Sequence, residues 1–181
     1  MSRRPAFPLS LYVRGRNVLV VGDGTRAAER ASRMQAAEAD VHRVSDEDYH
    51  PGLVQDAFVV IANSDDDDHN EVVVRHARAA GCIAYAHDRP DISDFAMPAL
   101  IQRGPLKIAI STDAVAPALS RRLREQLEAA LERSGAAIDA LVAELSDLRA
   151  RLPRGKRGNT LYRIASRMRL DGQFIVDDSG E

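Results

Sequence analysis

The 181-residue sequence predicts an α/β protein in which a parallel sheet is followed by a helical segment. Two observations carry this prediction. Up to about residue 112, short apolar runs alternate with amphipathic helical patterns, as in parallel strands joined by crossover helices. After Pro117 the leucines recur at roughly four-residue intervals, which places them on one face of a helix.

Five apolar runs are expected to form strands. Asn17–Val21 is continuously apolar, which is typical of a strand buried on both faces of a parallel sheet. The other four runs, assigned to the same sheet, are Val41–Val44, Ala57–Ala62, Ile83–Ala86 and Leu106–Ile110.

Helices are expected between these strands, with one gap. Thr25–Ala37 and Asn70–Ala80 have helical patterns, and the second should end at Gly81, in the usual C-terminal glycine position. The acidic run Asp65–Asp68 should cap its N-terminus rather than bind a metal. Only about a dozen residues separate the second strand from the third, too few for a crossover helix and another strand. The sheet should therefore lack one flanking helix–strand unit.

The C-terminal part is predicted to be helical at 118–133 and 138–152, followed by a basic linker at 153–159 and a helix at 160–170. We divide the chain into a sheet domain (1–112), a helical dimerisation segment (113–152) and a final linker, helix and acidic tail (153–181). The apolar faces of the helices need a partner, and a second copy of the chain is the expected one.

Composition excludes several classes of function. Aromatic residues make up 4% of the chain and tryptophan is absent, which argues against a base-stacking surface for nucleic acid. Cys82 is the only cysteine, so an internal disulfide and a cysteine-built metal site are excluded, and the histidines show no ligand spacing. Without a run of transmembrane length, a cytoplasmic protein is expected. The basic segment after Pro117 indicates an anionic partner or, equally, a solvated helix surface.

A dinucleotide-binding fingerprint, Gly22-x-Gly24-x-x-Ala27, lies between the first strand and the first helix. Gly22 permits the tight turn, Gly24 permits close approach of a pyrophosphate, and the helix N-terminus offers N–H groups to it. Asp46, with Glu47, stands at the distance where a carboxylate meets the ribose hydroxyls, which favours NAD over NADP, whereas Arg26 and Arg43 argue for NADP. This fingerprint makes the predicted sheet Rossmann-like. An ordinary strand–turn–helix corner is the alternative explanation of these residues.

Four stretches together resemble the precorrin-2 dehydrogenase and sirohydrochlorin ferrochelatase family, the N-terminal module of siroheme synthases. They are Phe7–Leu11, Arg14–Gly22, Val60–Asp66 with Asn70, and Asp88–Glu125, the most specific of the four. The resemblance implies NAD-dependent oxidation of precorrin-2 to sirohydrochlorin, in some members followed by metal insertion. It also implies a homodimer formed through the segment after Pro117.

The resemblance also assigns roles to residues. Asp88 would be the catalytic base, although a turn-forming role before Pro90 is the alternative. Thr112 would lie at the substrate in a loop whose usual Gly-Gly is Asp113-Ala114 here, and Arg121, Arg122 and Arg124 would suit the carboxylates of a tetrapyrrole. The NAD contacts would be Gly22, Asp23, Gly24, Thr25, Arg26, Asp46, Glu47, Ser64 and Asp65; no metal ligand is assigned.

Two other functions stay open at this point. The altered loop is also compatible with a tetrapyrrole-binding chelatase, carrier or regulator that has lost dehydrogenase activity. The third possibility is a regulatory domain that senses NAD(H) and contacts a partner through its basic helices.

Overall fold

The computed structural model describes residues 6–172, which divide into two compact units. The sheet unit comprises the residues up to Pro98 together with Ser111–Pro117, and the helical unit comprises Ala99–Ile110 and the residues from Ala118 onward. The three-part division at residues 112 and 152 stays a prediction.

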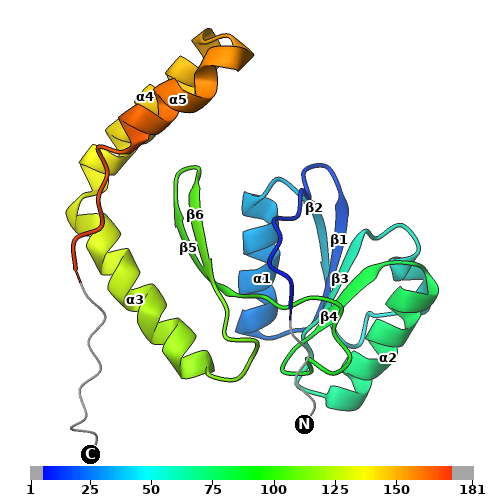
Figure 1. Ribbon diagram of the computed structural model, residues 1–181. Coiled ribbons are helices and arrows are strands. Elements are labelled where there is room, and N and C mark those ends of the chain that lie inside the picture. The colour runs from blue at the N-terminus through cyan, green and yellow to red at the C-terminus, as the bar shows by residue number, and fades with distance from the viewer. Residues whose placement is uncertain (1–5, 173–181) are drawn as a thin grey trace, which may run out of the picture. The chain divides into compact units, whose positions relative to one another are not determined.

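The sheet unit contains four parallel strands in the order β2-β1-β3-β4 (Figure 1). Their bounds are Asn17–Val21 for β1, Asp40–Val44 for β2, Val59–Ala62 for β3 and Ile83–Ala86 for β4. The two central strands, β1 and β3, are buried almost throughout, as their unbroken apolar runs predict. The α/β prediction is confirmed.

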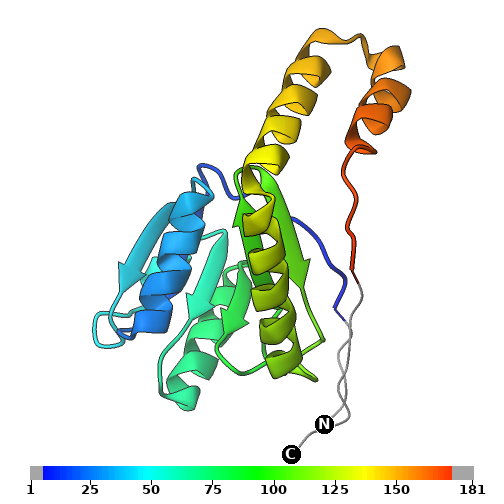
Figure 2. The same ribbon diagram turned by 90° about the vertical axis from the view of Figure 1, so that its left-hand side faces the viewer.

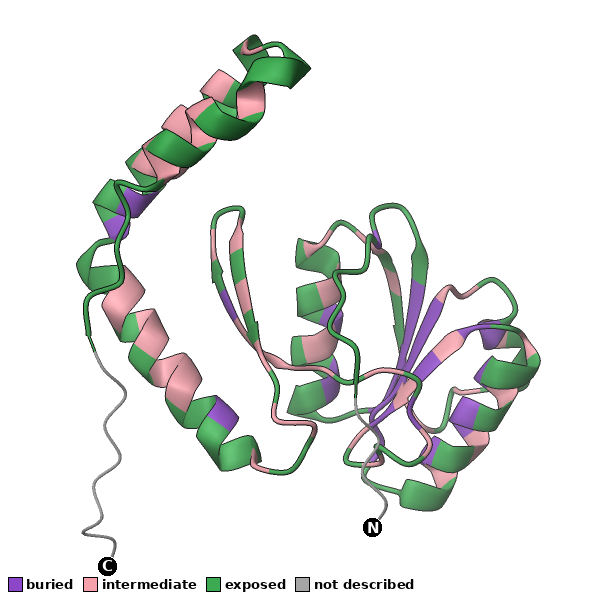
Figure 3. Cartoon of the chain, in the orientation of Figure 1, coloured by how far each residue is buried: buried purple, intermediate pink, exposed green. Residues whose placement is uncertain are grey.

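The two faces of this sheet are covered by different helices, α1 (Thr25–Ala36) and α2 (Asp67–Ala79) (Figure 1). Ala27 and Ala31 of α1 pack against Val18, Val20 and other residues on one face. Valines of α2 pack against the side chains that β1 and β3 direct to the other face. Buried residues concentrate on these strands and the inner sides of both helices (Figure 3).

The predicted gap between the second and third strands is confirmed. A single 3-10 turn, η1 (Pro51–Val54), stands between β2 and β3, and β1 pairs directly with both of them. Val54 of this turn is buried in the core, where it fills part of the space that the absent helix–strand unit would cover.

The predicted capping of α2 is also confirmed. The Asp66 carboxylate accepts hydrogen bonds from the backbone N–H groups of Asp68 (2.9 Å) and His69 (3.2 Å). At the other end, Gly81 adopts φ +79°, the left-handed conformation that glycine tolerates best.

The prediction for Leu106–Ile110 was wrong in part. This segment is a strand, β6, but it pairs antiparallel with β5 (Ala99–Arg103) in a separate two-stranded sheet of the helical unit. The cause is the two-residue connection Gly104-Pro105, in which Gly104 has φ +53° and forms a tight hairpin turn.

The helical unit also contains α3 (Pro117–Arg133), α4 (Gly135–Arg151) and α5 (Arg154–Ala165). The predicted basic linker at 153–159 was wrong, because α5 already begins at Arg154. Pro153 precedes that helix with φ −60°, and Arg157 Nε donates to the Leu152 carbonyl (2.8 Å). Figure 2 shows α5 folded back beside α4.

No described helix is long and apolar enough to cross a membrane. The acidic tail from residue 173 lies outside the described residues.

Candidate functional site

The loop after β1 needs glycine at its first position. Gly22 has φ +141°, and a Cβ atom there would stand 2.8 Å from the carbonyl carbon of Asn63, at the end of β3. Both the backbone conformation and this close approach exclude a side chain. The loop is therefore locked to the neighbouring strand.

Gly24 serves a different purpose. It is the N-cap of α1, has ordinary extended angles (φ −70°, ψ 168°), and a Cβ built on it meets nothing within 4 Å. Among residues 6–172 no side chain caps the helix, and its first turn carries no acidic residue. The N–H groups that open α1, from Thr25 and Arg26 onward, are left without a capping side chain, as an anion-binding helix terminus requires.

Arg43 of β2 holds this loop from the carbonyl side. Its guanidinium donates to the backbone oxygens of Gly22 (3.2 Å), Asp23 (2.7 Å) and Gly24 (3.4 Å). Sequence reasoning considered Arg43 only as a cation that would favour NADP and did not assign it to this loop. The three bonds come from the Nε and Nη2 donors of Arg43 and hold the carbonyls of the loop in place.

Asp23 turns away from the helix and toward Asp46. Its Oδ2 accepts from the backbone N–H of Asp46 (3.1 Å), so the loop after β1 is tied to the loop after β2. The Asp46 Oδ2 in turn accepts from the Ser64 hydroxyl (2.7 Å). Three residues predicted for one site, from the ends of three strands, are therefore linked by hydrogen bonds.

One carboxylate oxygen of Asp46 has no hydrogen-bond partner in the part of the chain that the structure describes. Its Oδ1 is buried and lies 3.8 Å from His69 Nε2, which also lacks a hydrogen-bond partner among the described residues. Sequence reasoning missed His69 because it treated the acidic run before it as capping alone. Glu47 and Asp65 are exposed beside this pair.

Ser64 is fixed by Asn70 of α2. The Asn70 amide accepts from the Ser64 N–H (2.9 Å) and donates to the Ser64 carbonyl (2.9 Å), and both residues are buried. A buried amide that satisfies both backbone groups of one residue holds that residue in place. The Ser64 hydroxyl is thus directed at Asp46.

Asp88 lies two residues after the last residue of β4, at the carboxyl end of the sheet. It has φ +52°, and its side chain is 84% exposed, with Oδ2 3.4 Å from His87 Nε2. A positive φ in a non-glycine residue is uncommon and is found often at functional sites. The backbone thus presents the carboxylate to solvent beside a largely buried imidazole.

Two arginines of α1 reach the same place. Arg26 contacts His87 Nε2, and Arg30 contacts His87 Nδ1 (3.2 Å). Arg30 is itself positioned by Tyr85, stacking 4.4 Å above its ring and donating to its hydroxyl (2.9 Å). The signal in the sequence was the four-residue spacing of the arginines, which puts both on one face of the helix.

Burial lowers the pKa of His87, and the charges of Arg30 and Arg26 lower it further, against the opposing effects of Asp88 and Asp65. The imidazole is therefore held neutral. Burial raises the pKa of Tyr85, so its hydroxyl stays protonated.

Thr112 also belongs to the sheet unit. Its Oγ1 accepts from the Ala116 N–H (3.2 Å) in a loop where Asp113 (φ +50°) and Ala114 (φ +61°) are both left-handed. Two residues that carry side chains, Asp113 and Ala114, therefore adopt a backbone conformation that suits glycine.

The three arginines expected to meet substrate are engaged along α3 itself. Arg121 and Arg122 pair with Glu125, and Arg124 pairs with Glu128. They lie in the helical unit.

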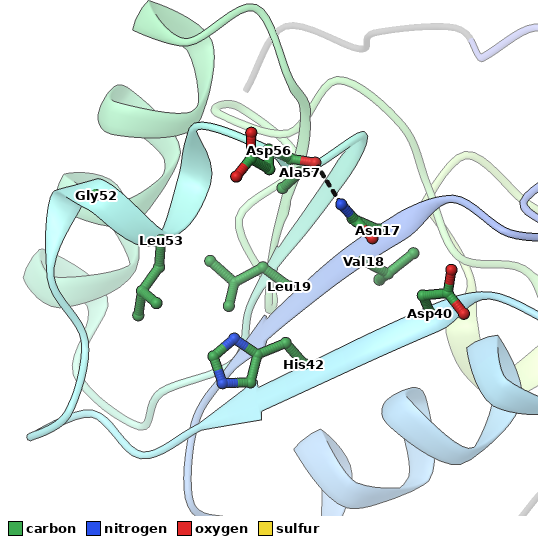
Figure 4. A pocket seen from close by; sticks show the side chains of 9 residues that line it. All are labelled: Asn17, Val18, Leu19, Asp40, His42, Gly52, Leu53, Asp56 and Ala57. Carbon is green, nitrogen blue, oxygen red and sulfur yellow. Dashed lines mark hydrogen bonds between the residues drawn. The ribbon is translucent and has the colours of Figure 1, made fainter.

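A cavity of about 330 Å³ lies at the opposite end of the sheet (Figure 4). It is lined by residues at the starts of β1 and β2, including Asn17 and Asp40, and by η1. Because the glycine loop follows the other end of β1, this cavity does not belong to the candidate site.

Comparison with known proteins agrees with this geometry. Residues 9–99 match the family described as "Putative NAD(P)-binding", and residues 103–130 match "Sirohaem biosynthesis protein central". The chain is 34% identical to the siroheme synthase of Nitrosomonas eutropha over 143 residues, 68% of this chain and 30% of that protein. It is 35% identical to the siroheme synthase of Gluconacetobacter diazotrophicus over 167 residues, 80% of this chain and 35% of that protein.

The chain thus spans about a third of the length of the curated relatives it matches. Among solved structures it is similar to "SirC, precorrin-2 dehydrogenase", with a TM-score of 0.70 and 22% identity, over 88% of this chain and 89% of that one. At this identity the likeness shows a shared fold.

Proposed function

Because the chain belongs to the family of siroheme synthase N-terminal modules and precorrin-2 dehydrogenases, we propose that it oxidises precorrin-2 to sirohydrochlorin with NAD as the hydride acceptor. The family's NAD(P)-binding domain is the sheet unit. The single observation that carries the proposal is the convergence of the glycine loop, Asp46 and Asp88 on the carboxyl end of one parallel sheet.

The residues present fit a dinucleotide. The uncapped start of α1 supplies main-chain N–H groups from Gly22 to Arg26 for the pyrophosphate, and Gly24 leaves room for it. The unpartnered Oδ1 of Asp46 can accept from a ribose hydroxyl. When bound, NAD⁺ supplies the electrophile that takes a hydride from the substrate.

NAD is favoured over NADP by the charges at the ribose end. Asp46 and Glu47 would repel a 2′-phosphate, and Ser64 and Asp65 add no positive charge. Arg43, the nearby cation, already donates through Nε and Nη2 to three backbone carbonyls, which leaves only its Nη1 group for that phosphate.

Asp88 is proposed as the base. Its exposed carboxylate can take the proton that the substrate loses, while the hydride leaves to the cofactor, so the two hydrogens removed are balanced. Its Oδ2 lies 3.4 Å from Nε2 of His87, whose lowered pKa disfavours a full ion pair between the two side chains. Thr112 is proposed to contact the substrate from its strained loop.

A homodimer is proposed for the helical unit. Leu119 is 52% exposed, and the leucines that follow it on α3 are only half-buried within one chain. A second copy would cover these apolar side chains. Arg121, Arg122 and Arg124 remain proposed ligands of substrate carboxylates, which would have to compete with Glu125 and Glu128.

One observation favours a second candidate. Asp113, in the loop that carries Thr112, has a carboxylate side chain and a left-handed backbone. The negative charge of this carboxylate would disfavour a reactive position for a polyanionic substrate. A chelatase, carrier or regulator that binds the tetrapyrrole without oxidising it is the resulting alternative, and an NAD(H)-sensing domain is a further one.

The variant Asp88→Asn separates these functions. A dehydrogenase should keep its affinities for NAD⁺ and tetrapyrrole but lose NADH production. If wild-type protein binds the tetrapyrrole but never produces NADH, the carrier or chelatase function is correct instead. Binding of NAD⁺ alone would leave the sensing domain.

A further inference from the structure

The imidazole of His87 faces more hydrogen-bond donors than it can accept. Arg26 contacts its Nε2 and Arg30 contacts its Nδ1. A guanidinium only donates, and a neutral imidazole has one accepting nitrogen, since the other carries the proton. In either tautomer, one of the two arginines therefore faces an N–H group and lacks an acceptor there.

Neither arginine has a carboxylate partner among the described residues. Arg14, Arg78 and Arg89 of the same unit each form an ion pair, whereas Arg26 and Arg30 form none. The Nη1 of Arg30 is also buried without any hydrogen-bond partner in the described part of the chain. A cluster with two permanent positive charges and unused donors is suited to an anion.

The side chains of Arg30 and His87 in this cluster are held in fixed positions. Arg30 is held by the Tyr85 ring and hydroxyl, and His87 is 15% exposed. Arg26 stands one turn earlier on α1, at the open end of the cluster, where its side chain is exposed. The arginine forks are therefore pre-oriented, and a ligand can reach them from solvent.

We propose that Arg26, Arg30 and His87 form a binding site for one carboxylate of the tetrapyrrole, next to Asp88. This inference rests on the proposed function and assigns part of its substrate to particular residues. A carboxylate matches the planar fork of a guanidinium. The charges of Asp65 and Asp88 also act on His87, so the site suits a singly charged group better than a phosphate.

The site would have two consequences for the reaction. An acetate or propionate arm bound there would hold the macrocycle over the carboxyl end of β4, close to the Asp88 carboxylate. It would also supply the acceptor that His87 cannot provide to both arginines at once.

The test uses Arg26→Gln, with Arg33→Gln as the matched control. Arg33 is an exposed residue of the same helix outside the cluster, so the two variants lose the same charge. The probes are sirohydrochlorin, titrated by its absorbance, and NAD⁺, titrated by calorimetry. Arg30→Lys serves as a second variant that keeps the charge but removes the fork.

Arg26→Gln and Arg30→Lys should each weaken sirohydrochlorin binding by about tenfold or more, as expected for a lost charge-assisted hydrogen bond. Their NAD⁺ affinity should match that of wild type, and Arg33→Gln should change neither. Unchanged sirohydrochlorin affinity in Arg26→Gln would overturn the inference, as would a loss of NAD⁺ affinity of the same size, which would assign the arginines to the cofactor phosphates. A wild-type chain that binds NAD⁺ but no sirohydrochlorin would instead overturn the proposed substrate itself, and this inference with it.

Discussion

Replacement of the two loop glycines should separate folding from cofactor binding. In Gly22→Ala the new Cβ would stand 2.8 Å from the Asn63 carbonyl carbon, in a backbone at φ +141° that alanine rarely adopts. Backbone strain of about 1–3 kcal/mol and overpacking of about 1–3 kcal/mol add to a loss of roughly 2–6 kcal/mol in the free energy of unfolding. For a chain of this size that lowers Tm by about 4–24 °C.

Gly24→Ala is the matched control. Its angles suit alanine, and its Cβ meets nothing within 4 Å, so stability should change by less than about 1 kcal/mol. The same Cβ would occupy the space proposed for the pyrophosphate, so NAD⁺ affinity should fall by about tenfold or more.

Urea unfolding followed by circular dichroism and calorimetric titration with NAD⁺ measure the two effects. The reasoning is refuted if Gly22→Ala is as stable as wild type, because the close approach to Asn63 would then be absent. It is also refuted if Gly24→Ala binds NAD⁺ with unchanged affinity, because the pyrophosphate would then lie elsewhere.

Three further predictions follow from the same unit. Asp46→Asn should weaken NAD⁺ binding by about tenfold and so reduce the ratio of NAD⁺ affinity to NADP⁺ affinity. Calorimetric titration with both nucleotides measures this ratio, and an unchanged ratio would contradict the assignment of Asp46 to the ribose. Because the pKa of His87 is lowered in the folded state, the unfolded chain binds the extra proton first, so stability should fall as the pH drops below about 6.5. Thermal melts of His87→Gln should show a smaller loss over that range, and an identical pH profile would count against burial of the ring. Ala114→Gly should raise the free energy of unfolding by about 1 kcal/mol by relieving the left-handed strain at φ +61°; a destabilised variant in urea unfolding would show that the strain is not there.

Much of the sheet unit could be predicted from sequence because its signals are local. The continuous apolar run Asn17–Val21 specifies a strand covered on both faces, and the short segment before β3 leaves room only for η1. The cap at Asp66 and the glycine at Gly81 fix α2 through backbone hydrogen bonds within a few residues.

The helical unit was harder to predict from sequence, because the incorrect predictions concern segments whose structure depends on turns. The hairpin of β5 and β6 follows from the two-residue turn Gly104-Pro105, and no strand was predicted at Ala99–Arg103 to pair with Leu106–Ile110. Gly155 and Gly158 suggested a linker, yet α5 forms because it packs beside α4 and begins after Pro153. Packing overrode local propensity there.

The candidate site was predicted as a set of residues but not as a set of interactions. The fingerprint located Gly22 and Gly24, and the spacing located Asp46. Nothing in the sequence showed that Arg43 would bind the loop carbonyls or that Arg30 would reach Tyr85, since these contacts join residues from different strands and helices.

The central claim is that this chain transfers a hydride from precorrin-2 to NAD⁺ with Asp88 as the base. Anaerobic incubation of purified protein with precorrin-2 and NAD⁺ tests it most directly, with NADH and sirohydrochlorin followed together by absorbance. The account predicts that both products appear in equal amounts and that Asp88→Ala, although folded and able to bind NAD⁺, yields neither above the rate without enzyme. Wild-type protein that binds both ligands yet forms no NADH would contradict it.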